Sequence, residues 1–116
     1  MQTNFAYNDR TLRIDGSEPA IETEFEWPIA QIIPMGSIAV VRTEPEQGAR
    51  DNRNVFAVDA GGEIIWRVSE RVHVYPDSPY TNLSLQDGLL TLSNWDGLNL
   101  KIKPFTWEEV GSDYGR

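Results

Sequence analysis

Apolar and polar residues alternate along most of this chain in short runs, which end at clusters of Gly, Asp and Asn. The run 21–27 shows this pattern over its whole length. Because successive side chains of a strand point to opposite faces, its β-branched and aromatic residues would face a core. The other face would present three carboxylates, those of Glu22, Glu24 and Glu26.

Runs of this kind predict about ten short strands and no helix. Asp-Gly pairs at 87–88 and 96–97 predict tight hairpin turns. We therefore expect an all-β protein, a single domain over residues 1–116 in which an antiparallel meander closes as a small sandwich or barrel. The expected strands cover residues 4–7, 11–14, 21–27, 29–33, 37–42, 54–58, 63–68, 71–75, 82–85, 89–93, 98–103 and 106–110.

The segment 54–67, NVFAVDAGGEIIWR, contains a strand, an Asp-containing turn with two glycines, and a second strand that closes on Trp66. It resembles the blade hairpin of quinoprotein-type (PQQ-like) β-propellers. Segment 89–110 resembles the propeller pattern loosely, and nothing before Ile38 resembles it. The segments NVFA, DSPY and NWDG are similar to segments of short bacterial β proteins. The resemblance implies blade-like hairpins. A ring needs about four to eight blades, more than 116 residues supply, so no quinone site and no cofactor are expected.

Both faces of this hairpin are apolar, which is typical of a strand pair covered on two sides. One face would carry Val55, Ala57, Ile64 and Trp66 into a core. The second face carries Phe56, Val58 and Ile65 and would also be covered. The sequence therefore predicts that this hairpin is the central scaffold of the domain.

Composition narrows the classes of partner. The chain has 18 acidic and 10 basic residues and a net charge of −8. This charge opposes binding to DNA or RNA phosphates and favours a basic partner. The alternative explanation is solubility, for which many proteins are acidic. No run approaches the roughly 20 apolar residues that span a membrane, and the start lacks a signal-peptide pattern, so no membrane contact is expected. Together with the absence of cysteine, these features predict a cytoplasmic protein.

The sequence contains no phosphate-binding loop, nucleophile elbow or metal-ligand spacing. His73 shares a predicted strand face with Tyr75 and is interpreted as a surface histidine; as a general base it would need an orienting carboxylate, for which Asp77 is nearest. We therefore do not expect an enzyme or a metal site. The enzymatic alternative is a carboxylate mechanism through Asp51, Asp77 or Asp96.

The longest polar break in the chain, 43–53, ends in Arg-Asp-Asn-Arg and is the first candidate binding loop. The guanidinium group of Arg50 or Arg53 could bind a carboxylate or a phosphate. The alternative is an internal ion pair between Asp51 and one of these two arginines, which would fix the loop.

Two further loops, 77–82 and 94–96, offer polar and aromatic side chains, among them Trp95, which could stack on a ring. Ordinary turn chemistry is the alternative explanation for both. If the three loops lie at one end of the domain, they would form a polar-aromatic pocket. Its ligand-binding residues would be Arg50, Asp51, Asn52, Arg53, Asp77, Tyr80, Asn94 and Trp95.

The carboxylates of Glu22, Glu24 and Glu26 lie in the segment 14–41, which contains five acidic residues and no basic one. One interpretation is a solvated strand face whose charge prevents edge-to-edge aggregation. The other is a docking strip for a basic protein.

Three functional hypotheses follow. The first is a non-enzymatic binding module that recognises a small molecule or a protein segment through its loops. The second is an acidic inhibitor or immunity-type protein that neutralises a basic enzyme or sequesters its ligand, and the third is the carboxylate enzyme. Unprotected edge strands would also favour a homodimer.

Overall fold

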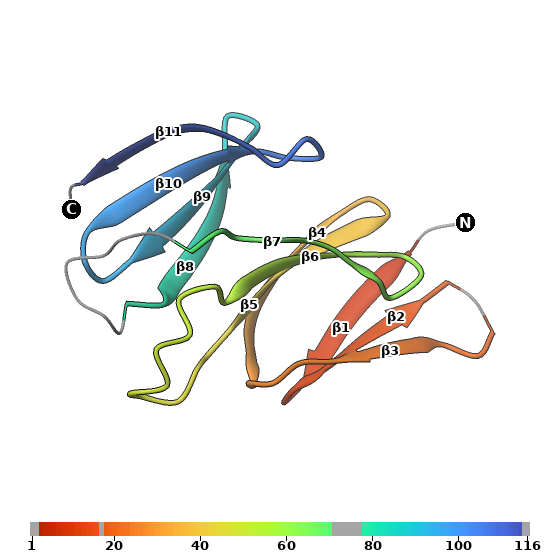
Figure 1. Ribbon diagram of the computed structural model, residues 1–116. Helices are drawn as coiled ribbons and strands as arrows, with labels where there is room; N and C mark the ends of the chain where they lie inside the picture. The colour runs from red at the N-terminus through yellow and green to blue at the C-terminus, as the bar shows by residue number, and fades with distance from the viewer. Residues whose placement is uncertain (1–2, 17, 71–77, 115–116) are drawn as a thin grey trace.

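The computed structural model describes residues 3–16, 18–70 and 78–114. These residues form eleven antiparallel strands in three sheets and no helix, which confirms the all-β prediction (Figure 1). The strands are β1 (Asn4–Asn8), β2 (Thr11–Asp15), β3 (Ile21–Glu24), β4 (Ile29–Met35), β5 (Ile38–Thr43), β6 (Val55–Asp59), β7 (Ile64–Arg67), β8 (Tyr80–Gln86), β9 (Leu89–Asn94), β10 (Leu98–Lys103) and β11 (Glu108–Tyr114).

Each sheet is an up-and-down meander of consecutive strands. The N-terminal sheet has the order β1-β2-β3, the middle sheet β4-β5-β6-β7 and the C-terminal sheet β8-β9-β10-β11. Several hairpins turn through residues with positive φ, including Asp9 (φ 55°), Gly36 (φ 70°) and Gly88 (φ 78°). The Asp-Gly pair at 87–88 therefore makes the tight turn that the sequence predicts.

The central strands of the middle sheet, β5 and β6, are buried on both faces. Every residue of β5 is buried, and its side chains alternate between two cores. Val40 packs in the core shared with the C-terminal sheet, which includes Leu90 and Leu100. Val41 packs in the core shared with the N-terminal sheet, which includes Leu12. The chain is thus a three-layer sandwich and not a barrel, with β6 buried on both faces as predicted.

The faces of the two outer sheets that point away from the middle sheet are polar. Arg13 lies beside Glu22 on the N-terminal sheet. On the C-terminal sheet, the Asn99 amide accepts a hydrogen bond from Ser93 and donates one to Asp113, whose carboxylate also pairs with Lys101 at 3.7 Å. These faces are solvated, so the stack is limited to three layers.

Two amide side chains join the middle and C-terminal sheets at the free edge of β8. Asn54, fully buried, accepts a hydrogen bond from the amide of Tyr80 and donates one to its carbonyl, at 2.9 Å each. Gln31 makes the same pair of bonds with Leu83, at 3.0 and 2.8 Å. Their hydrogen bonds take the place of those from a neighbouring strand, which this edge of β8 lacks. We call the two contacts, Asn54 with Tyr80 and Gln31 with Leu83, the amide clasps.

The turn between β6 and β7 lies against the N-terminal sheet. The Asp59 carboxylate accepts hydrogen bonds from two amides of the turn. Gly62 has a φ of 84°, and a Cβ at this position would come within 2.7 Å of Ile21. Its carbonyl accepts a 2.8 Å hydrogen bond from Thr23. Only glycine fits this close approach, which fixes the hairpin 54–67 against β3.

The boundaries of several elements differ from the prediction. β3 ends at Glu24 rather than at residue 27, because residues 25–28 cross from the N-terminal sheet to the middle sheet. The Ile29 amide, at the start of β4, donates a hydrogen bond to the Asp9 carbonyl. β7 is an edge strand with Ile64 and Ile65 exposed, so the second strand of the hairpin is less covered than expected. β11 continues to Tyr114. The predicted strand at 71–75 lies outside the described residues.

Candidate functional site

A groove of about 360 Å³ lies where three loops meet, and we call it the three-loop groove. Its walls come from the loop between β5 and β6, the residues at the start of β8, and the turn between β9 and β10. The loops that the sequence indicates as candidate binding surfaces therefore do lie together. The described residues that line the groove are Pro45, Gln47, Pro79, Thr81 and Trp95.

The first wall is held at the base of its loop. The Thr43 amide donates to the Asn54 carbonyl at 2.9 Å, and the Asn54 side chain donates back to the Thr43 carbonyl at 2.8 Å. Within the loop, the Ala49 amide donates to the Glu46 carbonyl at 3.0 Å. Gly48 has a φ of 87°, which this turn requires. Pro45 and Gln47 are thus presented on a loop with a closed base.

The opposite wall is a tight turn that exposes Trp95. Buried Asn94 accepts a hydrogen bond from the Leu98 amide through its side chain, at 3.1 Å, and another from the Gly97 amide through its carbonyl, at 3.2 Å. Trp95, which follows Asn94 in this turn, has 55% of its surface exposed. Such an indole offers a flat apolar face beside a polar N–H group.

Asp51, predicted to bind ligand, is engaged inside the protein. One carboxylate oxygen accepts a hydrogen bond from the Trp27 indole at 2.9 Å. The other accepts one from Arg67 at 3.1 Å and one from the Arg53 amide at 3.2 Å. Asp51 thus forms an internal ion pair, as the alternative interpretation of this loop predicted. Its partner is Arg67 rather than Arg50 or Arg53.

Three other predicted ligand residues support the fold, which corrects their assignment. Asn52 is buried and its side-chain oxygen accepts the Ser78 amide at 2.8 Å. Tyr80 is 1% exposed and packs in the core between the middle and C-terminal sheets. Asn94 is buried and shapes the turn that carries Trp95. The side chains of Asn52 and Asn94 thus satisfy buried backbone groups, and none of the three residues faces solvent.

The remaining predicted residues have different surroundings. Arg53 donates through Nε to the Val68 carbonyl at 2.9 Å and is half-buried. Arg50 is exposed with a φ of 60° and does not line the groove. Asp77 and His73 lie outside the described residues. Of the predicted ligand residues that the structure describes, Trp95 is the one that lines the groove.

Sequence reasoning missed Pro45, Gln47, Pro79 and Thr81 as lining residues. Pro45 and Pro79 lie in the candidate loops 43–53 and 77–82, but the candidate residues selected from the sequence are the charged, amide and aromatic ones of these loops. A proline in each of two long loops, with an aromatic residue in a third, was the signal that could have found them.

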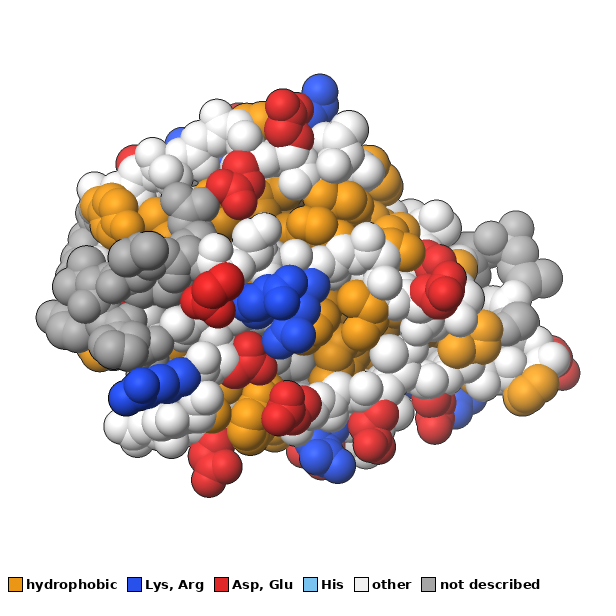
Figure 2. Space-filling view, viewed as in Figure 1, with side chains coloured by type: hydrophobic (Ala, Val, Ile, Leu, Met, Phe, Trp, Pro, Cys, Tyr) orange, Lys and Arg blue, Asp and Glu red, His pale blue; other side chains and the backbone are white. Residues whose placement is uncertain are grey.

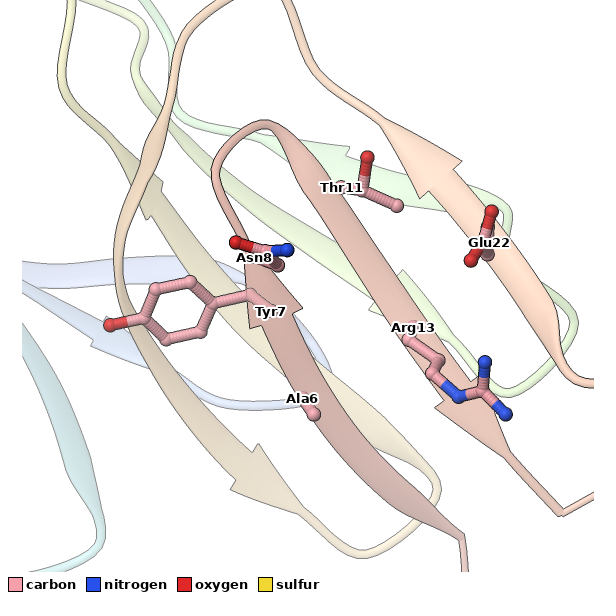
Figure 3. A pocket seen from close by; sticks show the side chains of 6 residues that line it. All are labelled: Ala6, Tyr7, Asn8, Thr11, Arg13 and Glu22. Atoms are coloured by element: carbon pink, nitrogen blue, oxygen red, sulfur yellow. The ribbon is translucent and has the colours of Figure 1, made fainter.

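The three predicted docking carboxylates do not form one acidic strip. Glu22 lies opposite Arg13 in the strand register, and both point to the same face beside Thr11 (Figure 3). Glu24 pairs with Arg10 at 3.8 Å, and Glu26 follows the end of β3. Two of the three acidic side chains therefore have a basic neighbour, and acidic groups are spread across the face shown in Figure 2 rather than gathered there.

A shallow trough of about 370 Å³ covers this polar face of the N-terminal sheet, and Figure 3 shows its lining side chains. Arg13 within it also pairs with Asp15 at 3.1 Å. A smaller cleft of about 190 Å³ lies between the N-terminal and middle sheets. It contains the Asp51–Arg67 pair and the Phe56 ring, over which the Arg67 guanidinium lies at 4.8 Å. Three charged residues of that cleft, Glu24, Asp51 and Arg67, form ion pairs.

The described ranges contain no group of three or more His, Cys, Asp or Glu side chains placed to hold a metal ion. Nor do they include a helix with the length and apolar character needed to cross a membrane.

Comparison with known proteins identifies the family. Residues 2–112 match the family described as Domain of unknown function (DUF7957). The chain belongs to this family. A search of curated proteins found no match. The DUF7957 match covers all three sheets except the last two residues of β11, so the sheets and the three-loop groove all fall within the family domain.

Proposed function

We propose that the protein is a non-enzymatic binding module that recognises its ligand in the three-loop groove. The observation that carries this proposal is the convergence of three loops, distant in sequence, around the exposed indole of Trp95. Ligand sites combine an apolar or aromatic surface with a few polar groups, and the groove offers Trp95 with Gln47 and Thr81.

The rigidity of the groove supports the proposal. Asn54 closes the loop that carries Pro45 and, with Asn52, also fixes residues 78–80 beside it. Asn94 fixes the turn that carries Trp95. Because its walls are held before a ligand arrives, binding costs less conformational entropy.

The test is a ligand screen by thermal shift against panels of metabolites and peptides, with Trp95→Ala beside the wild type. A ligand of the groove should raise the melting temperature of the wild type but not of the variant. At 100 times its Kd, such a ligand stabilises a protein by about 2.7 kcal/mol. The matched control is Phe105→Ala, which removes another exposed aromatic ring, in the turn between β10 and β11.

The control should respond to the ligand as the wild type does. The proposal is overturned if no panel member stabilises the wild type, or if every stabilising ligand acts equally on the Trp95→Ala variant.

The other two hypotheses have less support. An acidic inhibitor would need an uncompensated acidic surface, whereas Glu22 and Glu24 have Arg13 and Arg10 beside them. A carboxylate enzyme would need a free catalytic group, whereas Asp51 is held by three donors. We also propose a cytoplasmic location, supported by the absence of cysteine from the sequence.

A further inference from the structure

The shape of the three-loop groove favours an extended ligand. Three of its lining residues, Gln47, Thr81 and Trp95, are exposed, so the groove is open along its rim. Sites for small molecules typically enclose about 70–90% of the ligand surface. A peptide segment in an extended conformation can instead lie along an open groove.

The groove surface favours proline in that segment. Pro45, Pro79 and Trp95 supply rings, and neither proline nitrogen can donate a hydrogen bond. Aromatic-lined grooves bind the polyproline II conformation, whose carbonyl groups have no internal partners. The Gln47 amide can donate to such a carbonyl. Thr81 already donates to the Ser93 carbonyl at 3.3 Å, so its hydroxyl oxygen is oriented to accept from an amide.

Charge favours a basic residue beside the prolines. Glu46, between Pro45 and Gln47, is exposed and has no ion pair among the described residues, whereas Glu44 is paired with Arg42 at 3.0 Å. Asp96 adjoins Trp95, and the net charge of the chain is −8. Neither of the two basic residues of the same loop, Arg50 and Arg53, lines the groove. A Lys or Arg on the ligand would therefore meet a carboxylate and the face of an indole.

We propose that the three-loop groove binds an extended, proline-containing peptide segment that carries Lys or Arg. This inference rests on the proposed function and names the class of its ligand. Its three supports are the open rim, the ring surfaces of Pro45, Pro79 and Trp95, and the unpaired charge of Glu46.

Fluorescence anisotropy with three short labelled peptides tests it. The first is proline-rich with arginines at its ends, the second is proline-rich with glutamates, and the third is a Gly-Ser peptide with the same arginines. The proline-arginine peptide should bind at least about tenfold more tightly than either of the others, given one lost ring contact or one lost ion pair.

Three variants locate the binding. Trp95→Ala should weaken binding of the proline-arginine peptide about tenfold, because it removes the stacking surface. Glu46→Gln should weaken it a few-fold and make the remaining affinity less dependent on salt. Phe105→Ala should leave it unchanged.

Each contrary result overturns the inference in a recognisable way. Equal binding of the Gly-Ser peptide would reduce the interaction to charge, and equal binding of the glutamate peptide would remove the role of Glu46. If no peptide binds while a ring-shaped small molecule stabilises the wild type but not Trp95→Ala, the peptide inference fails and the proposed function stands. If the groove responds to neither, both fail.

Discussion

Asn54, which the sequence did not single out, is the residue that ties the loop between β5 and β6 to the start of β8. Its side chain is fully buried and makes three hydrogen bonds, one to Thr43 and two to Tyr80. It therefore joins the base of the loop between β5 and β6 to the start of β8, and both segments line the groove. A single amide sets the distance between two segments that are 26 residues apart in sequence.

Replacing Asn54 with alanine should destabilise the protein by about 2–4 kcal/mol, because the backbone groups of Thr43 and Tyr80 would be buried without partners. Urea unfolding followed by circular dichroism measures this loss. The control Asn82→Ala, on the exposed side of β8, should change the free energy of unfolding by less than about 0.5 kcal/mol. Equal losses in both variants would contradict this role of Asn54.

Buried asparagines show why local sequence does not separate candidate binding residues from residues that support the fold. An asparagine or aspartate in a loop can face solvent or can satisfy buried backbone groups, and local sequence does not distinguish these cases. Asn52 and Asn94 were therefore predicted to bind ligand, although both are buried. Trp95 was predicted to be an exposed turn residue, and the structure places its exposed side chain in the lining of the groove.

At the scale of elements, the sequence was most informative about strands and turns. Short runs between turn residues predicted β5 and β10 closely, and Asp-Gly predicted the turn between β8 and β9. It did not predict how the strands divide into three sheets, because that division depends on residues far apart in sequence, such as Gln31 and Leu83. The end of β3 was missed because the hydrophobic pattern continues through a segment that crosses between sheets.

The edge strands β7 and β11 belong to different sheets but are connected by two aromatic rings. Trp66 of β7 and Trp107 of the turn before β11 are stacked, with ring centroids 4.9 Å apart and an interplanar angle of 14°. This contact lies at the side of the stack opposite to the amide clasps on β8. The middle and C-terminal sheets are thus joined at both sides.

Trp107→Ala should lower the free energy of unfolding by about 2 kcal/mol, since it removes a half-buried ring and its stacking contact. A double-mutant cycle with Trp66→Ala should give a coupling of about 1 kcal/mol. The control, Phe105→Ala, removes an exposed ring from the same turn. Strictly additive losses in the cycle would show that the stacked pair is not a stabilising contact.

At the scale of the whole molecule, the free edges decide whether two chains can associate. The amide clasps occupy the edge of β8, and β11 carries Glu108, Glu109 and Asp113, which would repel a second copy of the same strand. β7 instead exposes Ile64 and Ile65 at its edge. Of these edges, β7 is the best suited to support the homodimer that the sequence suggests.

We therefore expect light scattering after size exclusion to give twice the chain mass of 13.2 kDa at high protein concentration. Ile65→Lys should reduce the mass to that of one chain, because a charged side chain would be buried at the interface. The matched control, Val110→Lys on β11, should remain dimeric. A wild type that stays at the mass of one chain would contradict the expectation.

Every described strand pairs only with its neighbours in sequence, yet the central strands of the middle sheet, β5 and β6, are buried on both faces. Short connections make each meander cheap to close in entropy, so each can begin to form independently. The middle sheet gains its burial only when both outer sheets have docked. We therefore expect the speed of folding to be set within each meander, and its cooperativity to depend on β5 and β6, which lose apolar burial when either outer sheet is undocked.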